Sequence, residues 1–200
     1  MTKRKAEKQK TDSSRFKDIL DAAARVFRQK GYHHANISDI AREVGLQKGS
    51  LYHHIKGKEE LLYKIIISAL DLYVKSLRSI VIYGMPADEA IRKAIIAHME
   101  PIGIKFDYIY VFINEMRNLP EEYRKEADSE LENYERLWIK MLEEGKACGL
   151  LKPDVDSKMT MLSIFGMCNW SVRWYKPERK YSTTDLAKIY ARNLLEGIKA

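Results

Sequence analysis

Apolar residues recur at spacings of three and four along almost the whole chain, and this periodicity constrains the fold more than any other feature. In the first third the stripe is formed by Phe16, Ile19, Leu20, Ala23, Val26 and Phe27. No stretch rich in β-branched residues shows the sustained alternation of a half-buried strand, and only 5 of the 200 residues are proline. The sequence therefore predicts an all-α protein.

Glycine and proline residues divide this pattern into about nine helices. The helices are expected at residues 14–30, 38–44, 47–54, 58–82, 87–104, 106–118, 120–148, 154–175 and 183–197. Ser38 and Asp154 are the predicted N-caps of the second and eighth helices. Either Ser182 or Thr183 is expected to cap the ninth.

Basic charge is concentrated in the first third of the chain. Residues 1–58 carry 14 Lys and Arg against 6 Asp and Glu, a net charge of +8, whereas the remainder carries 21 against 22, a net charge of −1. A polyanion-binding head on a near-neutral body explains this split, while a solvated basic tail would account only for Lys3 to Lys10. We expect a DNA-binding domain at residues 1–60 and a larger helical domain at residues 61–200.

The most informative segment runs from Ile37 to Leu62 and predicts two short helices joined at Gly45. The side chains expected to turn inward are Ile40, Ala41, Val44, Leu46 and Leu51. This leaves a short, polar, basic outer face formed by Gln47, Lys48, Ser50, Tyr52 and His53. Such a helix fits the DNA major groove, and Gly49 would let the backbone approach a phosphate or a base edge.

This segment resembles the DNA-binding signature of the TetR family of repressors. The matching residues are Ser38, Asp39-Ile40-Ala41, Gly45-Leu46, Gly49-Ser50-Leu51-Tyr52, His54, Lys58-Glu59 and Leu61. Gln47 and Ile55 depart from the Ser and Phe that are usual there. With Ile19-Leu20-Asp21-Ala22-Ala23 and the Phe27 to Tyr32 segment, the resemblance covers residues 14–62.

The resemblance implies a function for individual residues in binding double-stranded operator DNA. It implies phosphate contacts from Ser38, Ser50, Tyr52 and Lys58, and close approach to bases by Gln47, Lys48, Gly49 and His53. Without the resemblance, Ser50 and Tyr52 would be ordinary capping and packing residues, and His53 an ordinary solvent-facing one. His54 is interpreted as a half-buried structural residue.

The family resemblance also implies that the last two helices form a homodimer. Gly166 lies within an apolar helical stretch, where we expect it to permit close approach of another helix. The matching stripe on the final helix is Leu186, Ile189, Tyr190, Asn193 and Leu194. A two-fold dimer would suit a palindromic operator.

Aromatic and Met side chains in the C-terminal half suggest a site for a small-molecule effector. The segment from Asn169 to Pro177 resembles the TetR-type repressors of fatty-acid and steroid breakdown that respond to acyl-CoA thioesters. The resemblance implies an acyl-CoA effector with its phosphates near Arg173. The candidate ligand-binding residues are Phe112, Met116, Tyr134, Trp138, Asn169, Trp170, Arg173 and Trp174.

Structural interpretations of the same residues stay open. The aromatic stripe could be core, Trp170 and Trp174 could pack in the dimer interface, and a near-buried Arg173 could pair with a Glu. The effector could also be an unrelated hydrophobic compound of the multidrug type. A non-specific architectural DNA binder would share the basic head but would not need the large aromatic body.

The sequence gives no indication of an enzyme. It has no Gly-rich phosphate loop, HExxH motif or serine elbow, so we expect no catalytic residue, cofactor or metal site. Cys148 and Cys168 form no CxxC pair and are interpreted as buried reduced thiols, and His33-His34 as turn residues. Charged residues interrupt every apolar run, so we expect a cytoplasmic protein without a membrane partner.

Overall fold

The computed structural model describes residues 2–82, 85–178 and 180–199 of the 200-residue chain. Over these ranges the chain folds into nine α-helices and two short 3-10 helices. The one β-type contact among them is an isolated antiparallel bridge between Leu151 and Lys199. The prediction of an all-α fold is confirmed.

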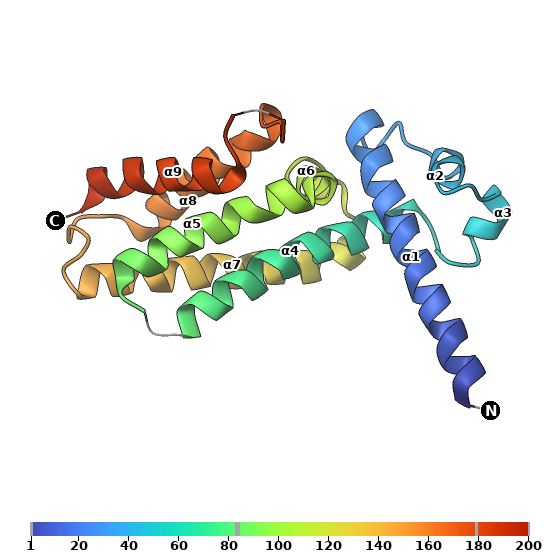
Figure 1. Ribbon diagram of the computed structural model, residues 1–200, viewed down its shortest axis with the longest axis horizontal. Helices are drawn as coiled ribbons and strands as arrows, with labels where there is room; N and C mark the ends of the chain where they lie inside the picture. Colours follow the sequence, from blue (N-terminus) through green and yellow to red (C-terminus); the bar gives the residue numbers. More distant parts are fainter. Residues whose placement is uncertain (1, 83–84, 179, 200) are drawn as a thin grey trace.

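Three helices form a head at one end of the molecule (Figure 1). They are α1 (Thr2–Lys30), α2 (Ile37–Glu43) and α3 (Lys48–Leu51). Helix α1 begins well before the expected residue 14. The apolar stripe that locates the helix starts only at Phe16, but the Lys-rich residues before it are good helix formers and include no Gly or Pro.

The remaining helices form an elongated body. They are α4 (Lys58–Ile82), α5 (Ala87–Ile104), α6 (Phe106–Glu115), η1 (Met116–Asn118), α7 (Glu121–Ala147), α8 (Ser157–Trp170), η2 (Ser171–Arg173) and α9 (Thr183–Ile198). The predicted bounds of α4 and α5 are confirmed. The segments expected at residues 106–118 and 154–175 each end in a 3-10 turn instead of continuing as one α-helix.

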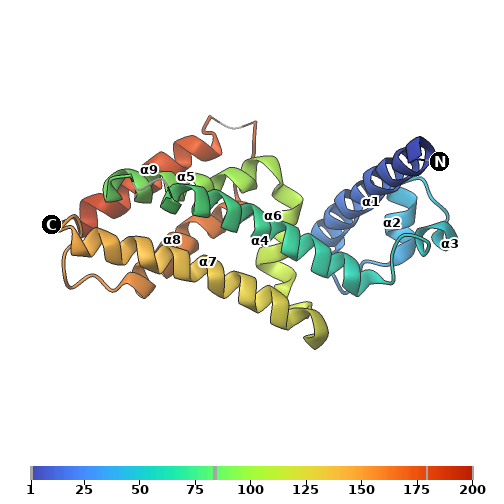
Figure 2. The same cartoon turned by 90° about the horizontal axis from the view of Figure 1, so that it is seen from below.

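Helix α4 connects the head to the body. It runs from the head along the long axis and packs against α5, α6 and α7, while α5 packs against α9 on the other side (Figures 1 and 2). The short α6 lies across the end of the body next to α1. Helices α4 and α6 are therefore the parts of the body that contact the head most directly.

The body core is built around the apolar face of α4. Leu62, Ile66 and Leu70 are fully buried. Tyr73 is also buried, at 1% exposure, whereas its neighbour Leu72 is only half-buried. The hydroxyl group of tyrosine disguises this position in a hydrophobicity pattern, although Tyr73 follows Ala69 at the required spacing of four.

The N-cap of α2 differs from the predicted one. Asn36, not Ser38, caps this helix, and its side chain accepts a hydrogen bond from the backbone N–H of Asp39 at 2.9 Å. The Asp39 carboxylate in turn accepts from the backbone N–H of Asn36 at 3.2 Å. The usual form of this capping box has Glu or Gln at the third position, and Asp is short enough to be overlooked there.

Two further boundaries are corrected by the structure. The helix expected at residues 47–54 shortens to α3, because the chain after Leu51 forms a turn that leads into α4. Asp156, not Asp154, caps α8 and accepts from the backbone N–H of Met159 at 2.9 Å. Ser182 is the cap of α9, in a capping box with Asp185.

Gly45 provides the backbone conformation that the head needs between α2 and α3. Its φ angle is +66°, in the left-handed region that L side chains rarely adopt. The backbone N–H of Leu46 then bonds back to the carbonyl of Ala41 at 2.8 Å, which closes the end of α2.

In the described part of the chain, no helix has both the length and the apolar character needed to cross a membrane.

Candidate DNA-binding surface and effector cavity

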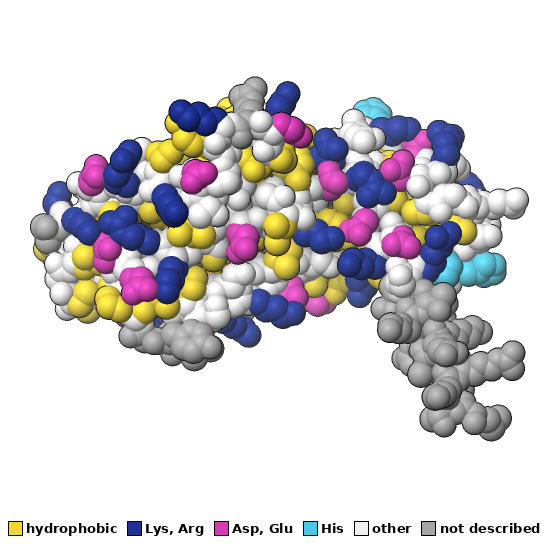
Figure 3. Space-filling view, viewed as in Figure 1, with side chains coloured by type: hydrophobic (Ala, Val, Ile, Leu, Met, Phe, Trp, Pro, Cys, Tyr) yellow, Lys and Arg dark blue, Asp and Glu magenta, His cyan; other side chains and the backbone are white. Residues whose placement is uncertain are grey.

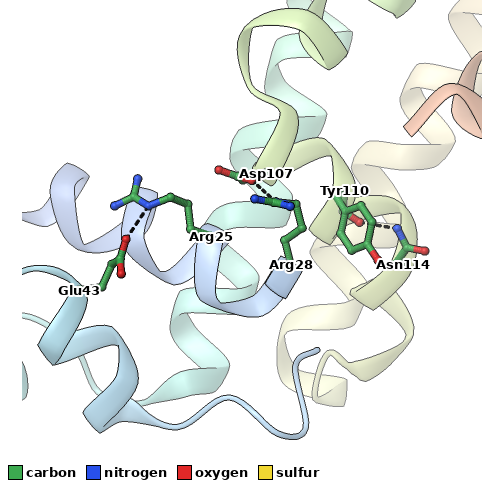
Figure 4. Close-up of polar contacts among 6 residues, drawn as sticks. All are labelled: Arg25, Arg28, Glu43, Asp107, Tyr110 and Asn114. Atoms are coloured by element: carbon green, nitrogen blue, oxygen red, sulfur yellow. Dashed lines mark hydrogen bonds and ion pairs between the residues drawn. The ribbon is translucent and has the colours of Figure 1, made fainter. Parts of the chain in front are cut away.

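Ion pairs fix α2 against α1 in the head. Arg25 Nε lies 2.9 Å from Glu43 Oε1, and Lys30 Nζ lies 2.7 Å from Asp39 Oδ1 (Figure 4 shows Arg25 and Glu43). The bond from Lys30 holds the pKa of the Asp39 carboxyl below its usual value. Leu51, the last residue of α3, and Ile40 of α2 are fully buried, so the inner side of this short helix packs against the apolar core of the head.

Seven of the eight predicted DNA-binding residues are exposed on the head. They are Ser38, Gln47, Lys48, Gly49, Ser50, Tyr52 and His53. Tyr52 leaves 49% of its surface exposed, which is unusual for a tyrosine on a packed helix. Figure 3 shows basic and His side chains at this end of the molecule. Lys56, which the sequence analysis did not select, is exposed in the turn that follows His53.

Lys58 lies apart from the other seven residues. Its Nζ donates hydrogen bonds to the backbone carbonyls of Tyr32, at 2.9 Å, and Ala35, at 3.1 Å. The ammonium group also lies 4.4 Å from the centre of the Tyr32 ring. Lys58 therefore holds the α1–α2 loop in place, and two of its three N–H donors are used within the protein.

A cavity of about 230 Å³ lies within the body. Its lining residues are Tyr73, His98, Phe112, Ile113, Met116, Leu131, Tyr134, Glu135, Phe165 and Asn169. They come from α4, α5, α6, η1, α7 and α8, so nearly every body helix contributes to the wall. Most of the lining is aromatic or aliphatic, which suits an apolar ligand group.

A buried histidine forms the polar centre of this wall. His98 Nε2 lies 3.0 Å from Asn169 Oδ1, and His98 Nδ1 lies 2.8 Å from the Tyr134 hydroxyl. Burial lowers the pKa of His98 to about 4, so the ring is neutral near pH 7. Because Asn169 Oδ1 can only accept, Nε2 carries the proton and Nδ1 accepts from Tyr134. The ring stacks against Tyr73 and Phe165.

The C-terminal half of the chain, residues 84–198, matches the profile described as "Tetracyclin repressor-like, C-terminal domain". Residues 19–65 match that of "Bacterial regulatory proteins, tetR family". The chain belongs to the TetR family. The exposed helix of the head, and all residues that line the cavity except Tyr73, lie in these matched segments.

Known proteins of this family resemble the chain along nearly its whole length. It is 28% identical over 187 residues to the HTH-type transcriptional repressor KstR2 of Rhodococcus jostii strain RHA1, covering 93% of this chain and 92% of that one. It is 25% identical over 185 residues to the fatty acid metabolism regulator protein of Bacillus subtilis strain 168, covering 92% and 95%.

A solved structure of another regulator has the same fold. The crystal structure of AibR in complex with isovaleryl coenzyme A and operator DNA superposes with a TM-score of 0.82 at 26% identity, covering 90% of this chain and 98% of that one. The protein is a TetR-family transcriptional repressor, homologous to regulators of lipid and steroid metabolism. These relatives also confirm that it is a regulator and not an enzyme.

Four of the eight predicted effector-binding residues of this TetR-family chain line the cavity. They are Phe112, Met116, Tyr134 and Asn169. Trp138 is fully buried behind the wall, edge-on to Tyr134 with 6.4 Å between ring centres. Its burial favours the core interpretation for this one residue.

The remaining three candidates lie outside the cavity. Trp170 is 64% exposed and Trp174 is 38% exposed. Our expectation of a near-buried Arg173 is wrong, because this side chain is exposed and donates from Nη2 to Asn114 Oδ1 at 2.8 Å. Helix α8 ends at Trp170, and the 3-10 turn that follows it carries Arg173 to the surface.

The sequence analysis missed Tyr73 and His98, which both line the cavity. A lone His within the apolar pattern of α5 is the one sequence signal that indicates His98, since it occupies the buried face between Ile95 and Ile102. For metals the structure adds no candidate: no three His, Cys, Asp or Glu of the described ranges gather in a suitable arrangement.

Helix α6 connects the cavity to the head of the repressor. Phe112 and Ile113 face the cavity, while Asp107 on the same helix forms an ion pair with Arg28 of α1 (Figure 4). Glu115, at the end of α6, accepts a hydrogen bond from the backbone N–H of Tyr32 at 3.2 Å. A ligand that moves α6 would therefore act directly on the C-terminal end of α1.

More contacts join the two units at the same place. Lys105, just before α6, lies 2.9 Å from Asp21 of α1. Asn118, in η1 after α6, lies 3.0 Å from His33 in the head loop. None of these cross-contacts could be seen in the sequence, because the paired residues are 79 to 85 positions apart.

Proposed function

We propose that this repressor binds a palindromic operator as a homodimer and is released from it by a coenzyme A thioester with a compact acyl group. The observation that carries the proposal is the position of α6 between the cavity and the head. One face of this helix contributes Phe112 and Ile113 to the cavity. Asp107 and Glu115, near its two ends, bind Arg28 and the backbone N–H of Tyr32 in the head.

The acyl group of the proposed effector occupies the cavity. The lining is mainly aromatic and aliphatic, and the cavity of about 230 Å³ suits a group smaller than a typical drug-sized ligand, for which roughly 300–1,000 Å³ is usual. Support for a thioester comes from AibR, whose structure contains isovaleryl coenzyme A, and from a relative that regulates fatty acid metabolism.

The coenzyme A phosphates lie near Arg173. This guanidinium is exposed and bonds Asn114, the neighbour of the cavity residue Ile113, so it lies close to the cavity wall. An exposed Arg can bind a phosphate with two parallel N–H donors without first losing a buried partner. Trp174, which directly follows this 3-10 turn, adds partly exposed aromatic surface.

The dimer forms through the outer face of α8 together with α9. Met159 is 58% exposed, Leu162 is 43% exposed and Trp170 is 64% exposed, all on one helical face. Gly166 lies on the same face, and a Cβ atom added there would meet no atom within 4 Å. This exposed apolar face with a gap at its centre is suited to the approach of a second copy.

Effector binding acts through linkage. The thioester binds more tightly to a conformation in which α6 and α4 hold the two heads at the wrong spacing for successive major grooves. DNA binds more tightly to the other conformation. The thioester and DNA therefore each weaken the binding of the other ligand. Helix α4 takes part because Lys58, its first residue, holds the head loop, and Tyr73, in its C-terminal half, lines the cavity.

A second candidate effector is a hydrophobic cation. Glu135 lines the cavity with several aromatic rings, and a carboxylate beside aromatic faces suits a positively charged group. In that case the exposed Arg173 would have no function in effector binding, which separates the two candidates.

The experiment begins with selection of bound sequences from a random DNA library by the purified protein. The selected operator is then used in a fluorescence anisotropy titration with isovaleryl-CoA, free isovalerate, coenzyme A and a lipophilic quaternary ammonium compound. We expect release by the thioester alone, and we expect Arg173→Ala to lose most of the response while keeping operator affinity. Arg78→Ala, an exposed arginine on α4, is the matched control.

Release by the ammonium compound but not by the thioester would replace this proposal with the second candidate. A normal thioester response in Arg173→Ala would exclude the proposed phosphate site but would leave the rest of the proposed function standing.

A further inference from the structure

Helix α3 begins after a residue whose side chain does not cap it. A helix N-cap is normally Ser, Thr, Asn or Asp, whose short side chain accepts a hydrogen bond from a backbone N–H of the first turn. Gln47 occupies this position in an extended conformation, with φ −75° and ψ 149°, and its side chain makes no cap hydrogen bond. The side chain is exposed, so the donor and the acceptor of its carboxamide are both available to a partner outside the helix.

The backbone at Gln47 is nevertheless held in place on both sides. Its carbonyl accepts from the backbone N–H of Leu51 at 3.2 Å, and Leu51 is fully buried. Before it, Gly45 adopts its left-handed φ and the N–H of Leu46 bonds to the carbonyl of Ala41 at 2.8 Å. The carboxamide therefore extends from a fixed point of the head, which the direct recognition of a base requires.

The surface around Gln47 suits a nucleic acid. No Asp or Glu occurs between residues 47 and 56, and this segment includes the exposed Lys48 and Lys56. A Cβ atom added at Gly49 would meet no atom within 4 Å, so the face beside Gln47 is unobstructed. Lysines bind the phosphates of any sequence, whereas an uncharged amide with both a donor and an acceptor can distinguish bases.

A carboxamide matches one base better than the other three in the major groove. Adenine presents N7 as an acceptor and its N6 amino group as a donor, so a glutamine can bond to both at once. Guanine presents two acceptors, which would leave the amide oxygen of the glutamine without a donor. Cytosine presents a donor and thymine an acceptor, so each uses only one side of the amide.

We propose that Gln47 reads an adenine in each half-site of the operator, accepting from its N6 amino group and donating to its N7. This inference rests on the operator binding of the proposed function and does not depend on the effector. It assigns the choice of one base pair to a residue at which this chain departs from the serine that is usual in the family. A serine hydroxyl would turn back to cap α3, so the departure replaces a helix cap by a base contact.

The test uses the operator that the full-length protein selects from a random DNA library. Each adenine of one half-site is replaced in turn by 7-deazaadenine, which keeps Watson–Crick pairing but lacks the N7 acceptor. In fluorescence anisotropy titrations we expect one of these replacements to weaken binding of the wild type about tenfold. In Gln47→Ala the same replacement should change affinity by about twofold or less, since the amide that bonds N7 is gone.

Gln47→Ser separates the recognition of a base from the structure of the helix. It should lose sensitivity to 7-deazaadenine as Gln47→Ala does, while its melting temperature rises by roughly 2–4 °C because the hydroxyl caps α3. Gln29→Ala is the matched control, because Gln29 is also an exposed glutamine of the head but lies on α1. This control should keep the wild-type sensitivity at every adenine.

Each result has a distinct meaning. A wild-type protein that tolerates 7-deazaadenine at every position, or a sensitivity that persists in Gln47→Ala, would overturn this inference and leave operator binding standing. A lower melting temperature of Gln47→Ala would also overturn it, because the carboxamide would then be bonded within the protein. If the protein selects no sequence from the library, the proposed function fails and this inference fails with it.

Discussion

The guanidinium of Arg28 in α1 forms an ion pair with the carboxylate of Asp107 in α6. Arg28 belongs to the DNA-binding head, and Asp107 lies in the first turn of α6, five residues before the cavity residue Phe112. This pair is one of four polar links across the same junction, alongside Lys105–Asp21, Tyr32–Glu115 and His33–Asn118. In the proposed mechanism, coupling between effector and DNA crosses this junction or follows α4.

Removal of the Asp107 charge should weaken that coupling. In Asp107→Asn we expect operator affinity to stay close to that of the wild type, because both side chains are about one-third exposed and the pair contributes little to stability. The acyl-CoA concentration for half-release should rise by roughly threefold or more, since residues of a coupling network change it by such amounts. Anisotropy titrations of the operator complex measure both quantities.

Asp88→Asn is the control for this effect. Asp88 also pairs with cations, Arg92 and Lys199, but lies at the start of α5, away from the head. If Asp88→Asn and Asp107→Asn change release equally, the α1–α6 junction has no special part in it.

Substitution of Lys58 should lower the stability of the protein, whereas substitution of Lys56 should weaken DNA binding. In Lys58→Met the carbonyls of Tyr32 and Ala35 lose their donor, so we expect a loss of about 1–3 kcal/mol in the free energy of unfolding. Lys56 is exposed, and Lys56→Met should leave stability unchanged while it weakens DNA binding at low salt. Thermal unfolding and operator titrations of both variants provide the comparison. Unchanged stability of Lys58→Met would contradict the structural role.

Acid should destabilise the protein through His98. The folded-state pKa is about 4 and the unfolded value is 6.5, so between these values the unfolded chain binds a proton that the folded one does not. This contribution to stability is present above pH 6.5 and is lost as the pH falls toward 4. From about pH 7.5 to about pH 5 the loss should be about 2 kcal/mol.

The His98→Gln variant tests this assignment by comparison of slopes, not of absolute stabilities. Its free energy of unfolding should vary less with pH over the same interval, whatever its value near pH 7. Denaturant titrations at several pH values provide the slopes, and an unchanged slope in the variant would assign the acid sensitivity to other groups.

Dimer formation should depend on the exposed face of α8. Leu162→Asp should convert the homodimer to a monomer of 23.3 kDa, because a carboxylate would be buried at the interface, while the half-exposed position tolerates the change within one subunit. Lys140→Asp, on the exposed face of α7, should remain dimeric. Light scattering at micromolar concentration measures the molar mass of both variants. A monomeric wild-type protein would contradict the proposed interface.

The head of the protein could be predicted from the sequence because its signals are local. Gly45 stands where a left-handed φ is needed, and the inward positions Ile40 and Leu51 are buried as the spacing predicts. The errors lie at the helix ends. The capping box between Asn36 and Asp39 and the early start of α1 depend on propensities that an apolar pattern does not display.

The effector site could be predicted only in part because it is assembled from distant segments. Phe112 and Asn169 were identified from aromatic density and from a resemblance, and they line the cavity. The pattern does not indicate Tyr73, because its hydroxyl excludes it from a hydrophobic stripe. The predicted burial of Arg173 is wrong because α8 ends earlier than expected. Which residues meet across a cavity depends on helix packing that periodicity does not encode.

A thermal-shift titration of the purified protein shows whether a coenzyme A thioester is the effector. The panel is isovaleryl-CoA, cyclohexanecarbonyl-CoA and palmitoyl-CoA, with coenzyme A and the free acids as controls. We expect a rise in melting temperature that grows with ligand concentration for the two compact thioesters and is small or absent for the controls and the long chain. No shift with any thioester, or equal shifts with the free acids, would contradict it.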